Sequence, residues 1–221
     1  MRIVLMGVAG TGKGTQADYL VKKYNLPHIS TGDIFRKNLK EKTEIGLKAK
    51  SFLEKGYLVP DFITTEIVEK RLVEVDCENG FILDGFPRNL AQAIHLDGFL
   101  SERNKKIDAV INIELNEDVL IKRALGRLVC IDCTSTFNQF FYPPKDLSIC
   151  PKCGGKLIRR EDDNLDSILN RISVYKGETL PLIEYYTHHG TLLHIDGTPS
   201  PAAVFKSIDS ELIRIEKSYH L

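Results

Sequence analysis

The sequence predicts an α/β fold in which helices cover both faces of a parallel sheet. The chain opens with an apolar, strand-like run at residues 2–6 that leads directly into a glycine-rich loop. Strand-like and helical patterns then alternate along most of the 221 residues. Because parallel strands need a crossover between them, usually a helix, this alternation favours a parallel sheet. Two segments, residues 30–59 and 127–163, break the alternation. We expect them to be insertions at the rim of the sheet, where ligands bind in this class of fold.

The individual elements follow from the spacing of apolar residues and from the turn residues between them. Strands are expected at residues 2–6, 81–83, 109–113 and 191–195, with a short extended piece at 27–29. Helices are expected at residues 15–24, 31–40, 44–55, 64–75, 90–101, 117–125, 164–188 (interrupted by Pro181) and 201–217. The core domain then comprises residues 1–29, 60–126 and 164–221.

The loop after the first strand has the composition of a phosphate-binding site. It reads Gly-Val-Ala-Gly-Thr-Gly-Lys-Gly-Thr over residues 7–15. Glycine reaches positive φ without steric cost, so the backbone can curl and point its amide groups at an anion. Lys13 supplies a mobile charge for the β- and γ-phosphates, and the Thr15 hydroxyl lies where a Mg²⁺ ligand is needed. A nucleoside triphosphate is therefore the expected ligand; the alternative is a glycine-rich turn without a ligand.

Composition narrows the classes of function. Thirty Lys and Arg residues balance 30 Asp and Glu residues, so no overall basic field is expected for nucleic acid. No stretch approaches 18 consecutive apolar residues, the length that a membrane-spanning helix needs, and the first residues lack the pattern of a signal peptide. We expect a soluble, cytoplasmic protein that binds neither nucleic acid nor membrane.

Four of the five cysteines form two closely spaced pairs. Cys130 and Cys133 are separated by two residues, as are Cys150 and Cys153. In a cytosolic chain such pairs favour a metal site over disulfides. The segment between the pairs is too small to bury a core of its own, a problem that structural Zn²⁺ commonly solves. Four thiolates leave no open coordination position, so the metal is expected to be structural. Two disulfides or four unpaired thiols are the alternatives.

A second motif follows the expected strand at residues 81–83. Asp84 comes at the carboxyl end of this buried strand, where a Mg²⁺ shell beside a phosphate loop needs negative charge. The turn at residues 85–87, Gly-Phe-Pro, is rigid and aims Arg88 across the cleft. An ordinary turn is the alternative interpretation of this motif on its own.

Arginines recur in the later part of the chain. Arg123 and Arg127 are four residues apart, so on a helix they would share a face. Arg160 closes the second insertion, and Arg171 lies in the helix that follows. Planar guanidinium groups supply the fixed positive charge that phosphoryl transfer requires. Solvated surface charge is the alternative for any one of them.

These motifs together resemble the adenylate kinases, in the long-lid form of these nucleoside monophosphate kinases that carries zinc. The resemblance covers nearly the whole chain. It implies a sheet of the P-loop NTPase type, a helical AMP-binding insertion at residues 30–59 and a small zinc-binding β lid at residues 127–163. It rests on the phosphate loop, the runs at residues 30–33, 56–59 and 84–88, Arg36, Gln92, Arg127, the four cysteines, Arg160, Asp162, Asp163 and Arg171.

The resemblance also implies roles for individual residues. ATP is expected to contact Gly10, Thr11, Gly12, Lys13, Gly14, Thr15, Arg123, Arg127, Thr136, Phe137 and Pro199. AMP is expected to contact Thr31, Arg36, Tyr57, Leu58, Val59, Gly85, Phe86, Pro87, Arg88, Gln92, Arg160 and Arg171. The catalytic group is expected to comprise Lys13, Arg88, Arg127, Arg160 and Arg171, with Asp162 and Asp163 as a latch for the closed lid. Zn²⁺ is expected on Cys130, Cys133, Cys150 and Cys153.

The expected reaction is reversible phosphoryl transfer from Mg·ATP to AMP, giving two ADP, by a monomer without a covalent enzyme intermediate. Within the kinases, UMP, CMP or GMP as acceptor and GTP as donor are alternatives. In a different class, a zinc-ribbon nucleic-acid-binding module with a nucleotide switch is the alternative. The balanced charge and the pair Asp162 and Asp163 argue against that module.

Overall fold

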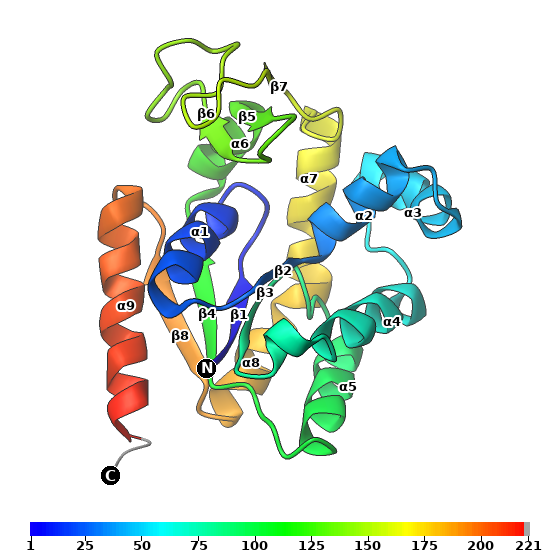
Figure 1. The fold of residues 1–221 in the computed structure, drawn as a ribbon, viewed down its shortest axis with the longest axis vertical. Coiled ribbons are helices and arrows are strands. Elements are labelled where there is room, and N and C mark those ends of the chain that lie inside the picture. The colour runs from blue at the N-terminus through cyan, green and yellow to red at the C-terminus, as the bar shows by residue number, and fades with distance from the viewer. Residues whose placement is uncertain (219–221) are drawn as a thin grey trace.

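The core is a five-stranded parallel sheet, as the sequence predicts. The computed structural model describes residues 1–218 (Figure 1). The sheet has the order β2-β3-β1-β4-β8 and each neighbouring pair is parallel. Its members are β1 (Arg2–Met6), β2 (His28–Ser30), β3 (Phe81–Asp84), β4 (Ala109–Glu114) and β8 (Leu192–Asp196). The strand β1 is central, so the loop that follows it opens at the middle of the carboxyl edge of the sheet.

Helices cover both faces of the sheet because successive side chains of each strand point to opposite sides. Ile3 and Leu5 pack on one face against α1 (Lys13–Tyr24) and α9 (Pro201–Ser218). Val4 and Met6 pack on the other face. That second face is covered by α4 (Asp61–Leu72), α5 (Leu90–Ser101) and α8 (Pro181–His188). Figure 1 shows α9 and α5 on opposite sides of the strands.

Several helix ends differ from the expected ones. α1 begins at Lys13, two residues early, because Gly12 at φ 102° already turns the chain into the helix. α4 begins at Asp61 directly after Pro60, and a short 3₁₀ turn at Val75–Cys77 follows it. The expected helix at residues 164–188, interrupted by Pro181, is two α-helices, α7 (Leu165–Val174) and α8, joined before that proline by a π-helical turn.

The first insertion is helical and has its own apolar centre. It contains α2 (Thr31–Lys40) and α3 (Glu44–Lys55), which project to the side of the sheet in Figure 1. The Ser30 hydroxyl accepts a hydrogen bond from the Asp33 N–H at 3.2 Å and so caps α2, as its position before the helix predicts. Phe35, Ala49 and Val59 are buried against Ile63 of α4. The insertion is therefore stabilised by packing.

The second insertion is a small β structure. After α6 (Glu117–Leu125) come β5 (Arg127–Cys130), β6 (Thr136–Asn138) and β7 (Leu157–Ile158), an antiparallel sheet of order β6-β5-β7. Figure 1 places it at one end of the molecule, above α1 and α7. The fold class is thus confirmed. The division at residues 30–59 and 127–163 into three domains stays a prediction. In the described part of the chain, no helix combines the length and apolarity needed to cross a bilayer.

Candidate active site

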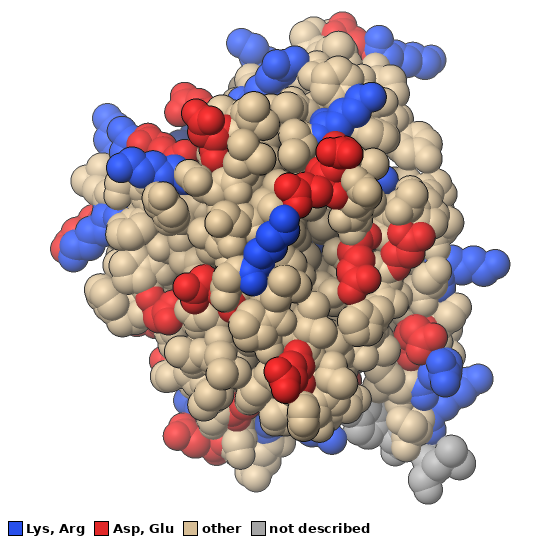
Figure 2. Space-filling view, turned by 180° about the vertical axis from the view of Figure 1, so that it is seen from behind, with Lys and Arg blue, Asp and Glu red and all other residues tan. Residues whose placement is uncertain are grey.

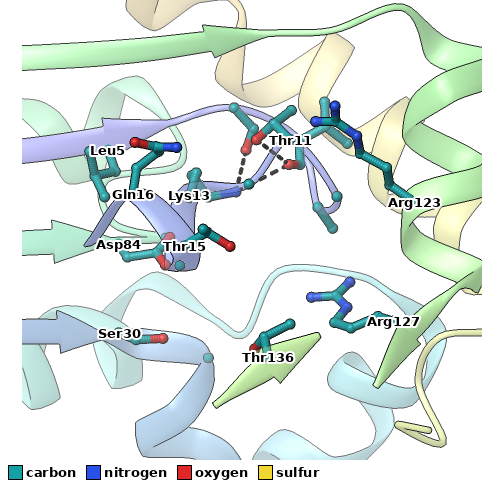
Figure 3. Close-up of a pocket in the computed structure, with 18 of the residues that line it drawn as sticks. Leu5, Thr11, Lys13, Thr15, Gln16, Ser30, Asp84, Arg123, Arg127 and Thr136 are labelled. Carbon is teal, nitrogen blue, oxygen red and sulfur yellow. Dashed lines mark hydrogen bonds between the residues drawn. The ribbon is translucent and has the colours of Figure 1, made fainter. Parts of the chain in front are cut away.

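A cleft of about 490 Å³ opens at the carboxyl edge of the sheet. The phosphate loop lies on one side of it, the turn after β3 at its base, and segments of both insertions around it. The neighbours of β1 leave in opposite directions along the sheet, β3 to one side and β4 to the other. Such a switch point is where open α/β sheets bind ligands. Figure 3 shows side chains from these separate elements directed toward the same space.

The phosphate loop owes its shape to glycine. Gly7, Gly10 and Gly12 have φ angles of 135°, 99° and 102°. A Cβ at Gly7 would lie 2.7 Å from the carbonyl oxygen of Ile113, so only glycine fits at that position. The Lys13 ammonium donates to the carbonyl oxygens of Gly7 at 2.7 Å and Val8 at 3.1 Å (Figure 3). The lysine is thereby folded back over the loop, next to where an anion would sit.

Lys13 and Asp84 form the charged centre of the cleft. Burial lowers the pKa of Lys13 to about 8, although Asp84 opposes the shift. Burial alone would raise the pKa of Asp84, but the neighbouring His28 ring and the charges of Lys13 and Arg88 bring it down to about 2. The His28 Nε2 atom lies 3.6 Å from the Asp84 carboxylate. Asp84 is therefore ionised at neutral pH, as a ligand for a divalent cation must be.

Arginines from both insertions meet at the side of the cleft that α2 borders. Arg36 of α2 pairs with Asp33 at 2.6 Å, and Arg160 at the end of the β insertion lies 3.8 Å from the same carboxylate. Burial lowers the pKa of Arg160 to about 10, and the charges of Arg36 and Arg127 add to this shift. The guanidinium of Arg160 is therefore still charged at neutral pH, among other cations. Such an arrangement favours a multiply charged anion.

The β insertion is tied to α7 by a network of ion pairs. The Arg127 Nε atom lies 2.9 Å from Asp163. Arg171 contacts Asp162 at 2.5 Å and Asp163 at 3.4 Å. Burial alone would raise the pKa of Asp162, but Arg171, Arg36 and Arg160 hold it below its ordinary value. These pairs bring the two arginines to the edge of the cleft.

Arg123 borders the part of the cleft that lies next to the residues after β8. Its guanidinium donates to the Gly197 carbonyl at 3.0 Å and lies 5.3 Å from the Phe141 ring centre. Pro199 lines the cleft beside it, as do Thr136 and Phe137 from β6. A flat ligand could stack in this part of the cleft, between the arginine and the β insertion.

Most of the residues predicted to bind nucleotide or to act in catalysis line the cleft, whereas five of them do not. Val59 and Phe86 are buried in apolar clusters. The Thr31 hydroxyl donates to the Gly85 carbonyl at 2.9 Å, and Gln92 accepts from the Arg88 N–H at 2.8 Å. These side chains support the turn at residues 85–88 from behind. Asp163 is the fifth, buried in its two ion pairs. The roles assigned to all the predicted residues stay predictions.

The cleft also contains residues that the sequence did not single out for it. His28 faces Asp84, and Asp33 contacts Arg36 and Arg160. Tyr175 and Thr179 line the cleft from the π-helical turn. Asp33 lies in the first turn of α2 after the cap at Ser30, so the sequence pattern of a helix start marks its position. No local pattern marks the other three, because each acts through a partner far away in the sequence.

The four paired cysteines form one cluster. Their sulfur atoms all lie within 4.8 Å of one another. The shortest separations are 3.5 Å for Cys130 and Cys153 and 3.6 Å for Cys133 and Cys150. A disulfide needs about 2.05 Å, so the alternative of two disulfides is wrong. A tetrahedral metal with bonds of about 2.3 Å places its sulfur ligands about 3.8 Å apart. The cluster can therefore hold a metal ion.

Comparison with known proteins agrees with this geometry. The family model described as adenylate kinase matches residues 5–191. Among curated relatives, an adenylate kinase of Caldanaerobacter subterraneus subsp. tengcongensis is 51% identical over 96% of both chains. An adenylate kinase of Clostridioides difficile is 50% identical over 96% of this chain and 98% of its own. An adenylate kinase of Bacillus cereus is 48% identical over 95% and 97%. The chain belongs to the adenylate kinase family.

Proposed function

We propose that this chain transfers a phosphoryl group reversibly from Mg·ATP to AMP, giving two ADP. The observation that carries the proposal is the convergence of cations on one cleft. Lys13, Arg88, Arg127, Arg160 and Arg171 come from separate stretches of the chain, and all line the cleft. Phosphoryl transfer needs little covalent chemistry from a protein. It needs two substrates held in line and fixed charge around the migrating group.

On the donor side, the loop amides and Lys13 bind the triphosphate. The amides of residues 10–15 face the anion and the dipole of α1 adds to their field. Arg123, Thr136, Phe137 and Pro199 hold the nucleoside end. Mg²⁺, when bound with ATP, neutralises phosphate charge and orients the γ-phosphoryl group. The Thr15 hydroxyl and the ionised Asp84 are the groups of this chain that fit its oxygen-rich shell.

On the acceptor side, AMP lies between the helical insertion and the turn after β3. Arg36 and Arg88 bind its phosphate, while Tyr57 and Leu58 border the space for its base. Arg160 and Arg171 reach toward both nucleotides and bind the transferred group. Because guanidinium groups donate paired hydrogen bonds, they fit the equatorial phosphoryl oxygens. Closing both insertions excludes water, so that ATP is not hydrolysed; lid closure in adenylate kinases is a known example of such gating.

The four-cysteine cluster holds structural Zn²⁺ in this proposal. Zinc prefers four sulfur ligands in a tetrahedron, and the sulfur separations fit that geometry. All four positions are filled by protein, so no position is left for a substrate. Zinc supplies stability to the β insertion and takes no part in the transfer.

The proposal includes a cytoplasmic monomer without nucleic-acid or membrane partners. Unbridged cysteines support a reducing compartment. Figure 2 shows acidic and basic side chains interspersed on the face opposite to that in Figure 1. That face presents no continuous basic surface of the kind that binds nucleic acid.

A coupled assay tests the activity and the choice of acceptor together. ATP is supplied with AMP, GMP, CMP or UMP in turn, and ADP formation is followed. AMP is expected to be the best acceptor by a wide margin. A better rate with another monophosphate would reassign the acceptor. No transfer to any of the four would overturn the proposal.

Two variants test the residues. Lys13→Ala and Arg88→Ala are each expected to lower kcat by at least ~100-fold, because removing one such donor typically costs roughly 3–4 kcal/mol of transition-state stabilisation. Arg214→Ala is the matched control, since Arg214 is 75% exposed on α9, where it pairs with Glu211. Circular dichroism confirms folding. Near-normal turnover in either cleft variant would remove that residue from the mechanism.

A further inference from the structure

The connection between α7 and α8 is a π-helical turn at Tyr175–Thr179. Within it the Leu180 N–H donates to the Tyr175 carbonyl, five residues back, at 2.9 Å. Pro181 follows, with no N–H of its own and a ring that excludes a carbonyl four residues before it. A wider turn accommodates the proline and keeps the helical path. Turns of this kind are frequent at functional sites.

The turn directs two hydroxyl groups into the interior of the cleft wall. The Tyr175 hydroxyl donates to the Asn112 side-chain oxygen in β4 at 3.0 Å. The Thr179 hydroxyl donates to the Arg88 main-chain carbonyl at 2.7 Å. Thr179 is buried, with 6% of its surface exposed. The first bond fixes the turn to the sheet, and the second joins it to Arg88, which we place on the phosphate of AMP.

Arg88 is held by neutral partners on three sides. Its N–H donates to Gln92 at 2.8 Å, and its Nε donates to the Gly85 carbonyl at 2.9 Å. The third is the hydrogen bond that the Thr179 hydroxyl donates to the Arg88 carbonyl. Of these three, only the Thr179 bond comes from outside the segment at residues 85–92. It therefore ties Arg88 to the connection between α7 and α8, whereas the Thr31 hydroxyl holds the start of the segment at Gly85.

Such a restraint matters because the neighbouring charges push Arg88 away. Burial lowers the pKa of Arg88; the carboxylate of Asp84 opposes this shift, and the charges of Arg171 and Arg36 add to it. Without a bound anion, like charges in a confined space repel one another. Directional bonds to uncharged groups then decide where the guanidinium lies. A displacement of about 1 Å at such a position can cost roughly 100-fold in rate.

We propose that Thr179 is a positioning residue for the phosphoryl transfer, acting through the Arg88 carbonyl. This inference rests on the proposed function. In this proposal the hydroxyl acts on the Arg88 carbonyl and not on a nucleotide. Its work is to hold the segment at residues 85–88 in register with Arg171, which lies on the same helical connection two turns earlier.

The test compares Thr179→Val with Thr179→Ser. Valine keeps the shape and removes the hydroxyl, and it leaves the Arg88 carbonyl unsatisfied. We expect kcat to fall about 3- to 10-fold, the range that one lost hydrogen bond allows. The KM for AMP is expected to rise, whereas the KM for ATP changes less than about twofold, because Arg88 faces the acceptor. Serine keeps the hydroxyl and is expected to restore kcat to within about twofold of the wild type.

A matched control is available about two helical turns further along the chain. The Thr187 hydroxyl in α8 also donates to a main-chain carbonyl, that of Ile183 at 2.6 Å, but Thr187 is exposed and away from the cleft. Thr187→Val is expected to leave all kinetic constants unchanged. If Thr179→Val does not fold, Thr179→Ala removes the same hydroxyl without a branched side chain and serves in its place.

A double-mutant cycle separates positioning from general destabilisation. Residues that act through one another are not additive. In the background of Arg88→Lys, Thr179→Val is therefore expected to lower kcat less than about 1.5-fold. Equal losses in both backgrounds, a normal kcat in Thr179→Val, or a serine variant as slow as valine would each overturn the inference. A wild type that does not transfer phosphate to AMP would instead overturn the proposed function.

Discussion

The two insertions border the same cleft but are stabilised by different means. The helical insertion buries Phe35, Ala49 and Val59 in an apolar centre of its own. The β insertion buries only Leu128 and Leu157 beside two of its cysteines. It leaves Ile131, Phe140, Tyr142 and Ile149 about half exposed or more. A small segment can thus dispense with a core when four thiolates bind a metal. The difference predicts that the two insertions fail under different conditions.

Metal removal is expected to have the largest effect, and only on the β insertion. Structural zinc in small domains contributes an apparent ~10–16 kcal/mol of binding free energy, so a chelator or Cys150→Ser removes most of what holds this sheet. Hydrogen exchange of residues 127–163 is expected to become fast, while α2 and α3 keep their protection. Activity is expected to persist at low temperature and to be lost on mild warming. Immediate and complete inactivation of folded protein would place the metal in the chemistry.

Phe35→Ala tests the opposite case. Phe35 is 3% exposed at the centre of the helical insertion, and its truncation is expected to cost about 3–5 kcal/mol. Hydrogen exchange is expected to speed up in α2 and α3 but not around the cysteines. Leu47→Ala is the matched control, because Leu47 on α3 is 58% exposed and should change stability by less than about 0.5 kcal/mol. Equal loosening of the β insertion would show that the two regions are not independent.

As the pH falls, the β insertion and the core are expected to lose stability at different pH values. Thiolates bind metal only when deprotonated, so the metal leaves as the pH falls. The core holds Asp84, whose pKa is lowered to about 2. A carboxyl with a lowered pKa stabilises the fold above its unfolded value of about 3.9 and loses that stabilisation as the pH falls toward 2. About 2 kcal/mol should therefore be lost between pH 4 and pH 2.

Urea unfolding at pH 5, 4, 3 and 2, with zinc release followed in parallel, checks this. Zinc is expected to leave at a higher pH than the one at which the core weakens. Asp84→Asn is expected to flatten the loss of core stability below pH 4. An unchanged slope in that variant would assign the acid sensitivity to other carboxyl groups.

The smallest expected effect concerns a helix cap in the helical insertion. The Thr43 hydroxyl accepts from the Gly46 N–H at 3.1 Å at the start of α3. Thr43→Ala is expected to cost about 1 kcal/mol, and Thr43→Ser to retain most of the stability. Thermal unfolding measures both. Indistinguishable alanine and serine variants would mean that the cap does not contribute.

The parts of the molecule that the sequence predicted well are those with local causes. The first strand, the loop and α1 form one continuous pattern, and the glycines at residues 7–12 take the positive φ that their composition predicts. The spacing of the four cysteines was enough to predict that they form one cluster. The sequence predicted that the strands are parallel but did not predict their order in the sheet. The position of β1 between β3 and β4 depends on how distant segments pair.

The features that the sequence did not predict depend on contacts between residues far apart in the chain. The break between α7 and α8 is a π-helical turn whose side chains bond to partners 63 and 91 residues away. No local pattern reports such bonds. Val59 and Phe86 belong to runs whose other members line the cleft, yet their side chains pack in apolar clusters. Their expected contact with AMP stays a prediction. A run of residues identifies the segment at a site but not which side chain faces the ligand.

The most direct measurement is the stoichiometry of products, by ³¹P NMR on wild-type protein with equimolar Mg·ATP and AMP. If the cleft binds two nucleotides and passes one phosphoryl group between them, two ADP form for each AMP consumed. Inorganic phosphate then stays at background, and the same equilibrium mixture is reached from ADP alone. Release of inorganic phosphate with AMP unchanged would contradict this, because the loop would then serve a nucleotide hydrolase rather than a transferase.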